Sequence, residues 1–131
     1  MTATDKNSNK LKVLYYMFLG HAAFLTLLTL LSSVLFFMMH ELFAAMYSSW
    51  LGPEAAALMS RSMMLLTMLL YVILIVVNVL AAQRLKHKTG FTLINIVCMT
   101  NIFFGGLSGL VTAIYGLVVV NEQGNKALFG N

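Results

Sequence analysis

Three polar side chains lie inside long apolar stretches of this sequence and are the first candidates for chemistry. They are His21, Asn78 and Asn95. Counting about 1.5 Å of rise per residue from the nearest basic cluster predicts that all three lie in the inner third of a membrane-spanning helix bundle. Polar groups at such depth usually hydrogen-bond across helices, and less often they form a proton or ligand site. We expect structural hydrogen bonding, with a proton or ligand site as the alternative.

Methionines are the second candidate, and the chain has ten of them. Met38, Met39, His40 and Met63 would suit Cu(I), because thioether and imidazole groups are soft ligands. Methionine is also an adaptable filler of contacts between helices, and this is the interpretation we prefer. We therefore expect no bound metal. His21 and His40 of one chain cannot share a haem, because they lie about 28 Å apart along one helix.

Catalytic groupings are harder to find. An intramembrane enzyme needs a nucleophile with a base, a pair of carboxylates or a metal cluster. The apolar stretches contain no Asp, Glu or Lys, and Ser32 and Ser33 have no acid–base partner nearby in the sequence. Cys98 lies between Val97 and Met99, so no basic neighbour activates its thiol. We expect neither enzymatic activity nor a cofactor.

The composition shows what kind of element must position these residues. Of the 131 residues, 60% are hydrophobic and 9% are charged, whereas a soluble domain carries about 25% charged residues. Lipid must therefore cover part of the chain. This excludes a secreted disulfide scaffold, a disordered tail and an ordinary cytosolic enzyme, and the single cysteine excludes an internal disulfide.

The first half of the chain predicts two spans with an amphipathic connection. Residues 13–39 contain no charge and are long enough to cross a hydrocarbon core of about 30 Å with some tilt. Aromatic and apolar residues within 41–51 fall near one helical face, which indicates a short interfacial helix. Pro53 then suits the first turn of a new helix, whose membrane part is predicted at 62–82.

Residues 89–121 form one uncharged stretch that would be about 50 Å long as a single helix, which is too long for one span without strong tilt. A run of glycines in its middle predicts a break into two short spans at 89–104 and 107–121. The alternative is one long helix, and hence three spans. In either case four small residues indicate close helix packing through one face: Gly105, Gly109, Ala113 and Gly116.

Two clusters of basic residues set the expected orientation. The clusters are Lys6, Lys10 and Lys12, and Arg84, Lys86 and Lys88. Positive charge beside membrane spans marks the cytoplasmic side, so the N-terminus is predicted to be cytoplasmic. Neither cluster is large enough to follow a phosphate backbone, and we expect no nucleic-acid partner.

The end of the sequence resembles a family of small membrane proteins. Residues 95–129 include Ala113-Ile-Tyr-Gly-Leu117 and close with Ala127-Leu-Phe129, and the basic connection Arg84–Lys88 is also similar. These features resemble small bacterial four-span inner-membrane proteins of uncharacterised function, although Phe103-Phe104-Gly105-Gly106 stands where such proteins have a turn proline. The resemblance implies four spans with both termini in the cytoplasm.

Together these observations predict an all-α integral membrane protein that forms a single transmembrane domain over residues 1–131. The expected location is the bacterial inner membrane, and the expected surroundings are the lipid bilayer and either other membrane subunits or further copies of the chain. The predicted function is that of a non-enzymatic accessory or structural subunit. The alternative is a protein that handles a small solute or copper through the Met/His set.

Overall fold

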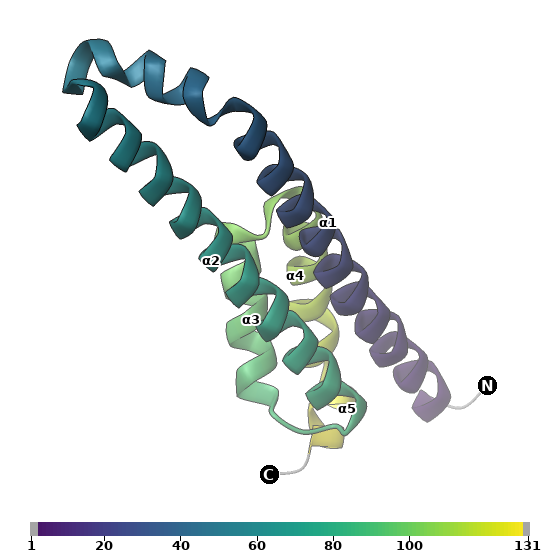
Figure 1. Cartoon of the computed structure of the whole chain (residues 1–131). Coiled ribbons are helices and arrows are strands. Elements are labelled where there is room, and N and C mark those ends of the chain that lie inside the picture. The colour runs from purple at the N-terminus through teal and green to yellow at the C-terminus, as the bar shows by residue number, and fades with distance from the viewer. Residues whose placement is uncertain (1–2, 130–131) are drawn as a thin grey trace. The chain divides into compact units, whose positions relative to one another are not determined.

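The computed structural model describes residues 3–129, with side chains from Asn7 onward, and within that range every regular element is a helix (Figure 1). The elements in order are α1 (Ala3–Leu51), α2 (Pro53–Lys86), α3 (Phe91–Phe104), α4 (Gly106–Asn121), α5 (Gln123–Lys126) and a 3-10 turn (Ala127–Phe129). The prediction of an all-helical chain is confirmed. Two helices, α1 and α2, are long and apolar enough to cross a membrane, and α3 and α4 are shorter apolar helices.

The first helix is longer than the sequence pattern suggested. It runs without interruption for 49 residues, so the expectation of a separate interfacial helix at 41–51 is wrong. The reason is that no glycine or proline lies between Gly20 and Gly52, and nothing else in that range breaks the hydrogen-bond ladder. The ribbon instead bends within its last turns (Figure 1).

The junction between α1 and α2 follows the expected chemistry. Gly52 adopts a left-handed conformation with φ of 80°, which only glycine reaches without strain. Its N–H donates to the carbonyl of Ser48 at 2.9 Å and closes the last turn of α1. Pro53 opens α2, where its missing N–H costs nothing and Glu54 lies at the positive end of the helix.

The glycines at the centre of 89–121 divide it into two helices, as expected, so a single helix over Thr89–Asn121 is wrong. Gly106 has a φ of 61°, and the chain reverses there so that α4 packs along α3. A side chain on Gly105 would lie 2.6 Å from the carbonyl oxygen of Asn101. The turn therefore needs glycine at both positions, one for its backbone angle and one for its close approach.

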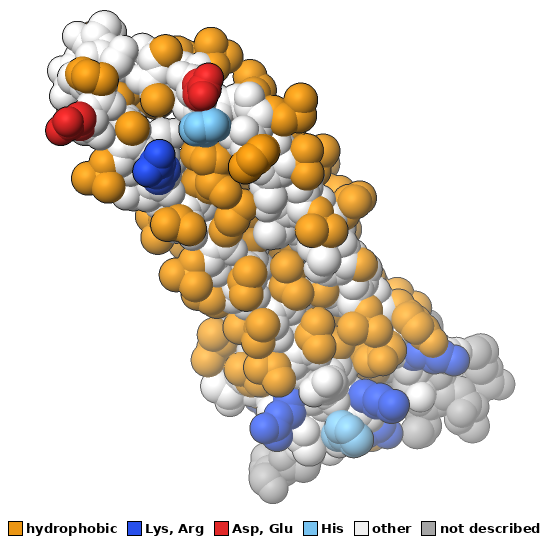
Figure 2. Space-filling view, viewed as in Figure 1, with side chains coloured by type: hydrophobic (Ala, Val, Ile, Leu, Met, Phe, Trp, Pro, Cys, Tyr) orange, Lys and Arg blue, Asp and Glu red, His pale blue; other side chains and the backbone are white. Residues whose placement is uncertain are grey.

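The chain divides into two compact units. The four-helix unit comprises Met1–Phe24 and Leu74–Asn131, and the helix-pair unit comprises Leu25–Ile73. The core of the four-helix unit receives buried side chains from α1, α2, α3 and α4, including Leu14, Phe18, Ala81, Leu85, Ile94, Val97, Ala113 and Val120. Most large apolar side chains of the helix-pair unit are exposed. Figure 2 shows hydrophobic groups, in orange, over much of the visible face of the molecule.

Candidate functional site

The best-formed polar contact in the four-helix unit joins Asn78 of α2 to Asn101 of α3. Each amide donates to the other, at 3.0 Å from Asn78 and at 2.7 Å from Asn101, and both residues are fully buried. Asn78 also donates to the carbonyl of Leu74 at 2.8 Å. Because both amides are satisfied where no water reaches them, this pair fixes the register of α2 against α3.

His21 of α1 is also buried, and its partner comes from α4. Its Nδ1 lies 3.0 Å from the hydroxyl of Ser108, whereas its Nε2 is buried without a hydrogen-bond partner among the described residues. The ring edge lies against Gly109, where an added Cβ would be 3.1 Å from both Cε1 and Nε2. The absence of a side chain at Gly109 therefore creates the space that the imidazole fills.

The third predicted polar residue, Asn95, pairs with Asn121. The Asn121 amide donates to Asn95 Oδ1 at 3.0 Å and to the carbonyl of Leu117 at 2.8 Å. The structure therefore gives each of the three predicted residues a different partner, and none of the three bonds to another. Their arrangement is that of separate links between helices.

Sequence reasoning did not identify these partners, although a signal was present. Like the three predicted residues, their partners are polar side chains within or at the end of apolar helices: Asn101, Ser108 and Asn121. Their importance depends on which helix faces they share, and this becomes visible only when the helices are assembled.

The small-residue face of α4 packs against two neighbouring helices. Gly109, Ala113 and Gly116 are all buried. A Cβ on Gly116 would lie 2.6 Å from the sulfur of Cys98 on α3 and 3.3 Å from a methyl group of Leu14 on α1. Cys98 is thus a buried packing group in this contact, and replacing the glycine would force it to move.

An ion pair that the sequence did not reveal ties the start of α1 to the end of α4. Lys10 Nζ lies 2.5 and 2.7 Å from the two carboxylate oxygens of Glu122. Asn125 donates to the same carboxylate at 3.3 Å and to the carbonyl of Val119 at 2.7 Å. Lys126, which is closer to Glu122 in sequence, instead lies over the ring of Phe91, 5.5 Å from its centroid.

The Met/His set of the helix-pair unit does not converge. Met38, Met39 and His40 are consecutive on a continuous helix, and neighbours in a helix point in different directions. Met38 is 75% exposed, and His40 Nδ1 lies 3.2 Å from the carbonyl of Phe37 in its own helix. Within the described residues, His, Cys, Asp and Glu form no cluster that could hold a metal ion.

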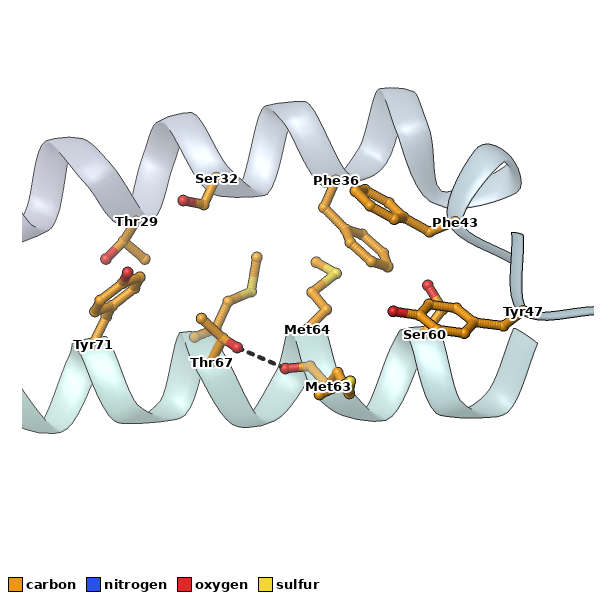
Figure 3. Close-up of a pocket in the computed structure, with 11 residues that line it drawn as sticks. Thr29, Ser32, Phe36, Phe43, Tyr47, Ser60, Met63, Met64, Thr67 and Tyr71 are labelled. Atoms are coloured by element: carbon orange, nitrogen blue, oxygen red, sulfur yellow. Dashed lines mark hydrogen bonds between the residues drawn. The ribbon is translucent and has the colours of Figure 1, made fainter. Parts of the chain in front are cut away.

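Met63 belongs to a different group, which lines a cavity of about 260 Å³ between the two helices of the helix-pair unit. Figure 3 shows Met64 extending from α2 toward α1 and Tyr47 crossing from the end of α1 toward α2. The hydroxyl of Ser60 is buried and has no hydrogen-bond partner among the described residues. The cavity is lined by Thr29, Ser32, Phe36, Phe43, Tyr47, Ser60, Met63, Met64, Thr67, Met68 and Tyr71.

Comparison of this chain with protein-family models, with curated proteins and with solved structures finds no match.

Proposed function

We propose that this chain is a non-enzymatic, multi-span protein of the bacterial inner membrane that acts as an accessory or structural subunit, in a homo-oligomer or in a larger membrane complex. The observation that carries the proposal is the exposed apolar surface of α1 and α2. In the most hydrophobic stretches of α1 and of α2, only 11% of the residues are buried within the chain. Exposed side chains there include Leu27, Leu30, Val34, Phe37, Leu65, Leu66 and Leu69. Such a surface needs lipid or protein to cover it.

Helix length supports the crossings by α1 and α2 in this four-span proposal. At about 1.5 Å per residue, α1 is about 74 Å long and α2 about 51 Å, and each exceeds a hydrocarbon core of about 30 Å. With 14 and 16 residues, α3 and α4 reach only about 21 and 24 Å, so the proposed crossings by these two helices require a thinner bilayer around them. The basic clusters favour a cytoplasmic N-terminus and a cytoplasmic α2–α3 connection, with the α1–α2 junction on the opposite side. Four crossings then return the C-terminus to the cytoplasm.

Labelling of single cysteines with a membrane-impermeant reagent tests this topology, in a chain whose native Cys98 is replaced by alanine. We expect Trp50→Cys and Leu107→Cys to be labelled from outside the cell, and His87→Cys and Gln123→Cys only after the membrane is opened. Labelling of position 123 from outside would indicate three crossings. A protected position 107 together with a protected position 123 would show that α3 and α4 enter and leave on the same side.

Cross-linking tests the role as a subunit. Cysteines at Leu30 and Leu66, which are 61% and 68% exposed, should form disulfide or short-linker products with another protein chain in native membranes. Val118 is equally exposed, at 59%, but lies in the four-helix unit and is the matched control. Mass spectrometry of complexes purified in mild detergent then separates a second copy from a different subunit. A chain that remains monomeric and uncross-linked at positions 30 and 66 would contradict the proposal.

The cavity supports a second candidate, the handling of a small solute or of copper. Three thioethers and one buried, unpartnered hydroxyl from α2 line the same space, contributed by Met63, Met64, Met68 and Ser60. The discriminating measurement is the amount of Cu(I) that the purified chain retains. Under this candidate, copper is retained and is lost on Met64→Leu with Met68→Leu, but not on Met38→Leu with Met39→Leu. Under the subunit proposal, neither pair of substitutions changes the copper content.

A further inference from the structure

A second cavity, of about 400 Å³, lies in the four-helix unit where the first turns of α1 meet the end of α2. Lys12, Lys86 and Lys88 line it together with Leu11 and Leu85. The two leucines are 5% and 3% exposed, so they form an apolar floor, and the three lysines are exposed around it.

The three lysines have no acidic partner among the described side chains. The acidic side chain described in this unit, Glu122, is already held by Lys10 through both of its oxygens. Three ammonium groups around one cavity repel one another, and they favour an anion between them. The negative end of α2 attracts Lys86, but it does not account for Lys12, which belongs to another helix.

The backbone adds a second feature at this place. Lys88 has a φ of 54° and is the non-glycine residue with a left-handed backbone among those described. This conformation is uncommon for lysine. Two backbone hydrogen bonds at the end of α2 hold this conformation. The Lys88 N–H donates to the carbonyl of Leu85, and the Thr89 N–H donates to the carbonyl of Arg84. The reversal brings Lys88 to the cavity already lined by Lys12 and Lys86.

Two tyrosines indicate what kind of anion fits. Tyr15 and Tyr16 also line the cavity, and their rings meet edge to face with centroids 5.2 Å apart. Tyr16 is 59% exposed and Val13 is 49% exposed, so an apolar surface leads away from the lysines. Tyrosine is enriched at the level of lipid headgroups, because its ring contacts the apolar chains while its hydroxyl reaches water.

We propose that this cavity binds the phosphate of an anionic phospholipid, with the lysines around the headgroup and the acyl chains leaving past Tyr16 and Val13. A basic pocket between helices on the cytoplasmic side is the arrangement that recognises such headgroups. Inorganic phosphate has the same charged group, but it would gain nothing from the leucine floor and the tyrosines. The inference rests on the membrane insertion proposed above.

Native mass spectrometry of the purified full chain in mild detergent tests the site. The probes are phosphatidylglycerol, phosphatidylcholine with the same acyl chains, and inorganic phosphate. We expect one phosphatidylglycerol to be retained at least about 10-fold more tightly than either alternative. Each lysine near a membrane surface contributes roughly a 5-fold factor in affinity, so Lys12→Gln with Lys86→Gln should weaken binding about 25-fold.

The matched control is Arg84→Gln with Lys126→Gln, which removes the same charge from residues that do not line the cavity. It should weaken phosphatidylglycerol binding less than about 3-fold, because these two side chains do not line the cavity and salt screens their charges from a phosphate bound there. Circular dichroism of both variants must match that of the native chain, so that lost binding is not lost folding.

The opposing outcomes are distinct. Equal losses in the two double variants would show general attraction to basic residues and overturn the site. Phosphate bound as tightly as the lipid would overturn the lipid assignment. If the cysteine labelling shows an inserted chain that binds the two lipids equally, this inference fails while the proposed function stands.

Discussion

Replacing Gly116 by alanine tests whether close packing between α4 and α3 requires glycine at this position. The added Cβ would lie 2.6 Å from Cys98 Sγ, whereas non-bonded heavy atoms prefer about 3.5–4.0 Å. The sulfur must therefore move by about 1 Å within a filled core, and overpacking of this kind costs about 1–3 kcal/mol. Alanine also removes the entropic penalty of glycine in a helix, which returns about 1 kcal/mol. The net effect is a free energy of unfolding lowered by about 0–2 kcal/mol.

The same contact predicts a compensating change. In a chain with Cys98→Ala, the sulfur is gone and the new methyl group at position 116 enters the space that it leaves. Gly116→Ala should then raise the free energy of unfolding by up to about 1 kcal/mol, the helix-propensity gain alone. The two substitutions are therefore coupled by about 1–3 kcal/mol.

Gly20 provides the matched control, because it lies within a helix of the same unit and an added Cβ would meet no atom within 4 Å. Gly20→Ala should stabilise by about 0.5–1 kcal/mol. All variants are compared by titration with sodium dodecyl sulfate in mixed micelles, followed by circular dichroism. If Gly116→Ala stabilises as much as Gly20→Ala while Cys98 is present, the steric argument is refuted.

Three further predictions follow from the buried contacts. Asn78→Ala and Asn101→Ala should each lower the free energy of unfolding by about 1–3 kcal/mol, because each leaves the other buried amide unpaired. A double-mutant cycle should give a coupling of about 0.6–1.7 kcal/mol between the two substitutions. Additive effects would contradict the pairing. Gly109→Leu should lower the free energy of unfolding by about 1–3 kcal/mol and so lower the temperature of aggregation in detergent. Val111→Leu, at a 54% exposed position, should leave that temperature unchanged. Equal aggregation temperatures for the two variants would count against a close contact at Gly109. Ser60→Ala should raise the free energy of unfolding by about 1 kcal/mol, because it removes an unpaired buried hydroxyl. A clear loss of stability in the titration with sodium dodecyl sulfate would instead reveal a hydrogen bond at that hydroxyl.

The helices themselves follow from local sequence. Gly52 with Pro53, and Gly105 with Gly106, end and restart helices because positive φ angles and missing donors act on the backbone at the positions where they occur. The apolar composition is likewise a property of the sequence, because it is a sum over single residues and does not depend on how the helices pack. The expectation that residues 41–51 form a helix of their own was wrong, because amphipathic spacing shows which face of a helix is apolar and does not show where the helix begins.

The polar contacts required the assembled molecule. The sequence by itself determined that His21, Asn78 and Asn95 lie in apolar helices and need partners. Only the tertiary structure decided that Asn78 meets Asn101 and that His21 meets Ser108, because such pairs depend on the rotation and axial position of one helix against another. Those two quantities are set by the packing of many side chains at once, including the close approach at Gly109, and no local pattern encodes them.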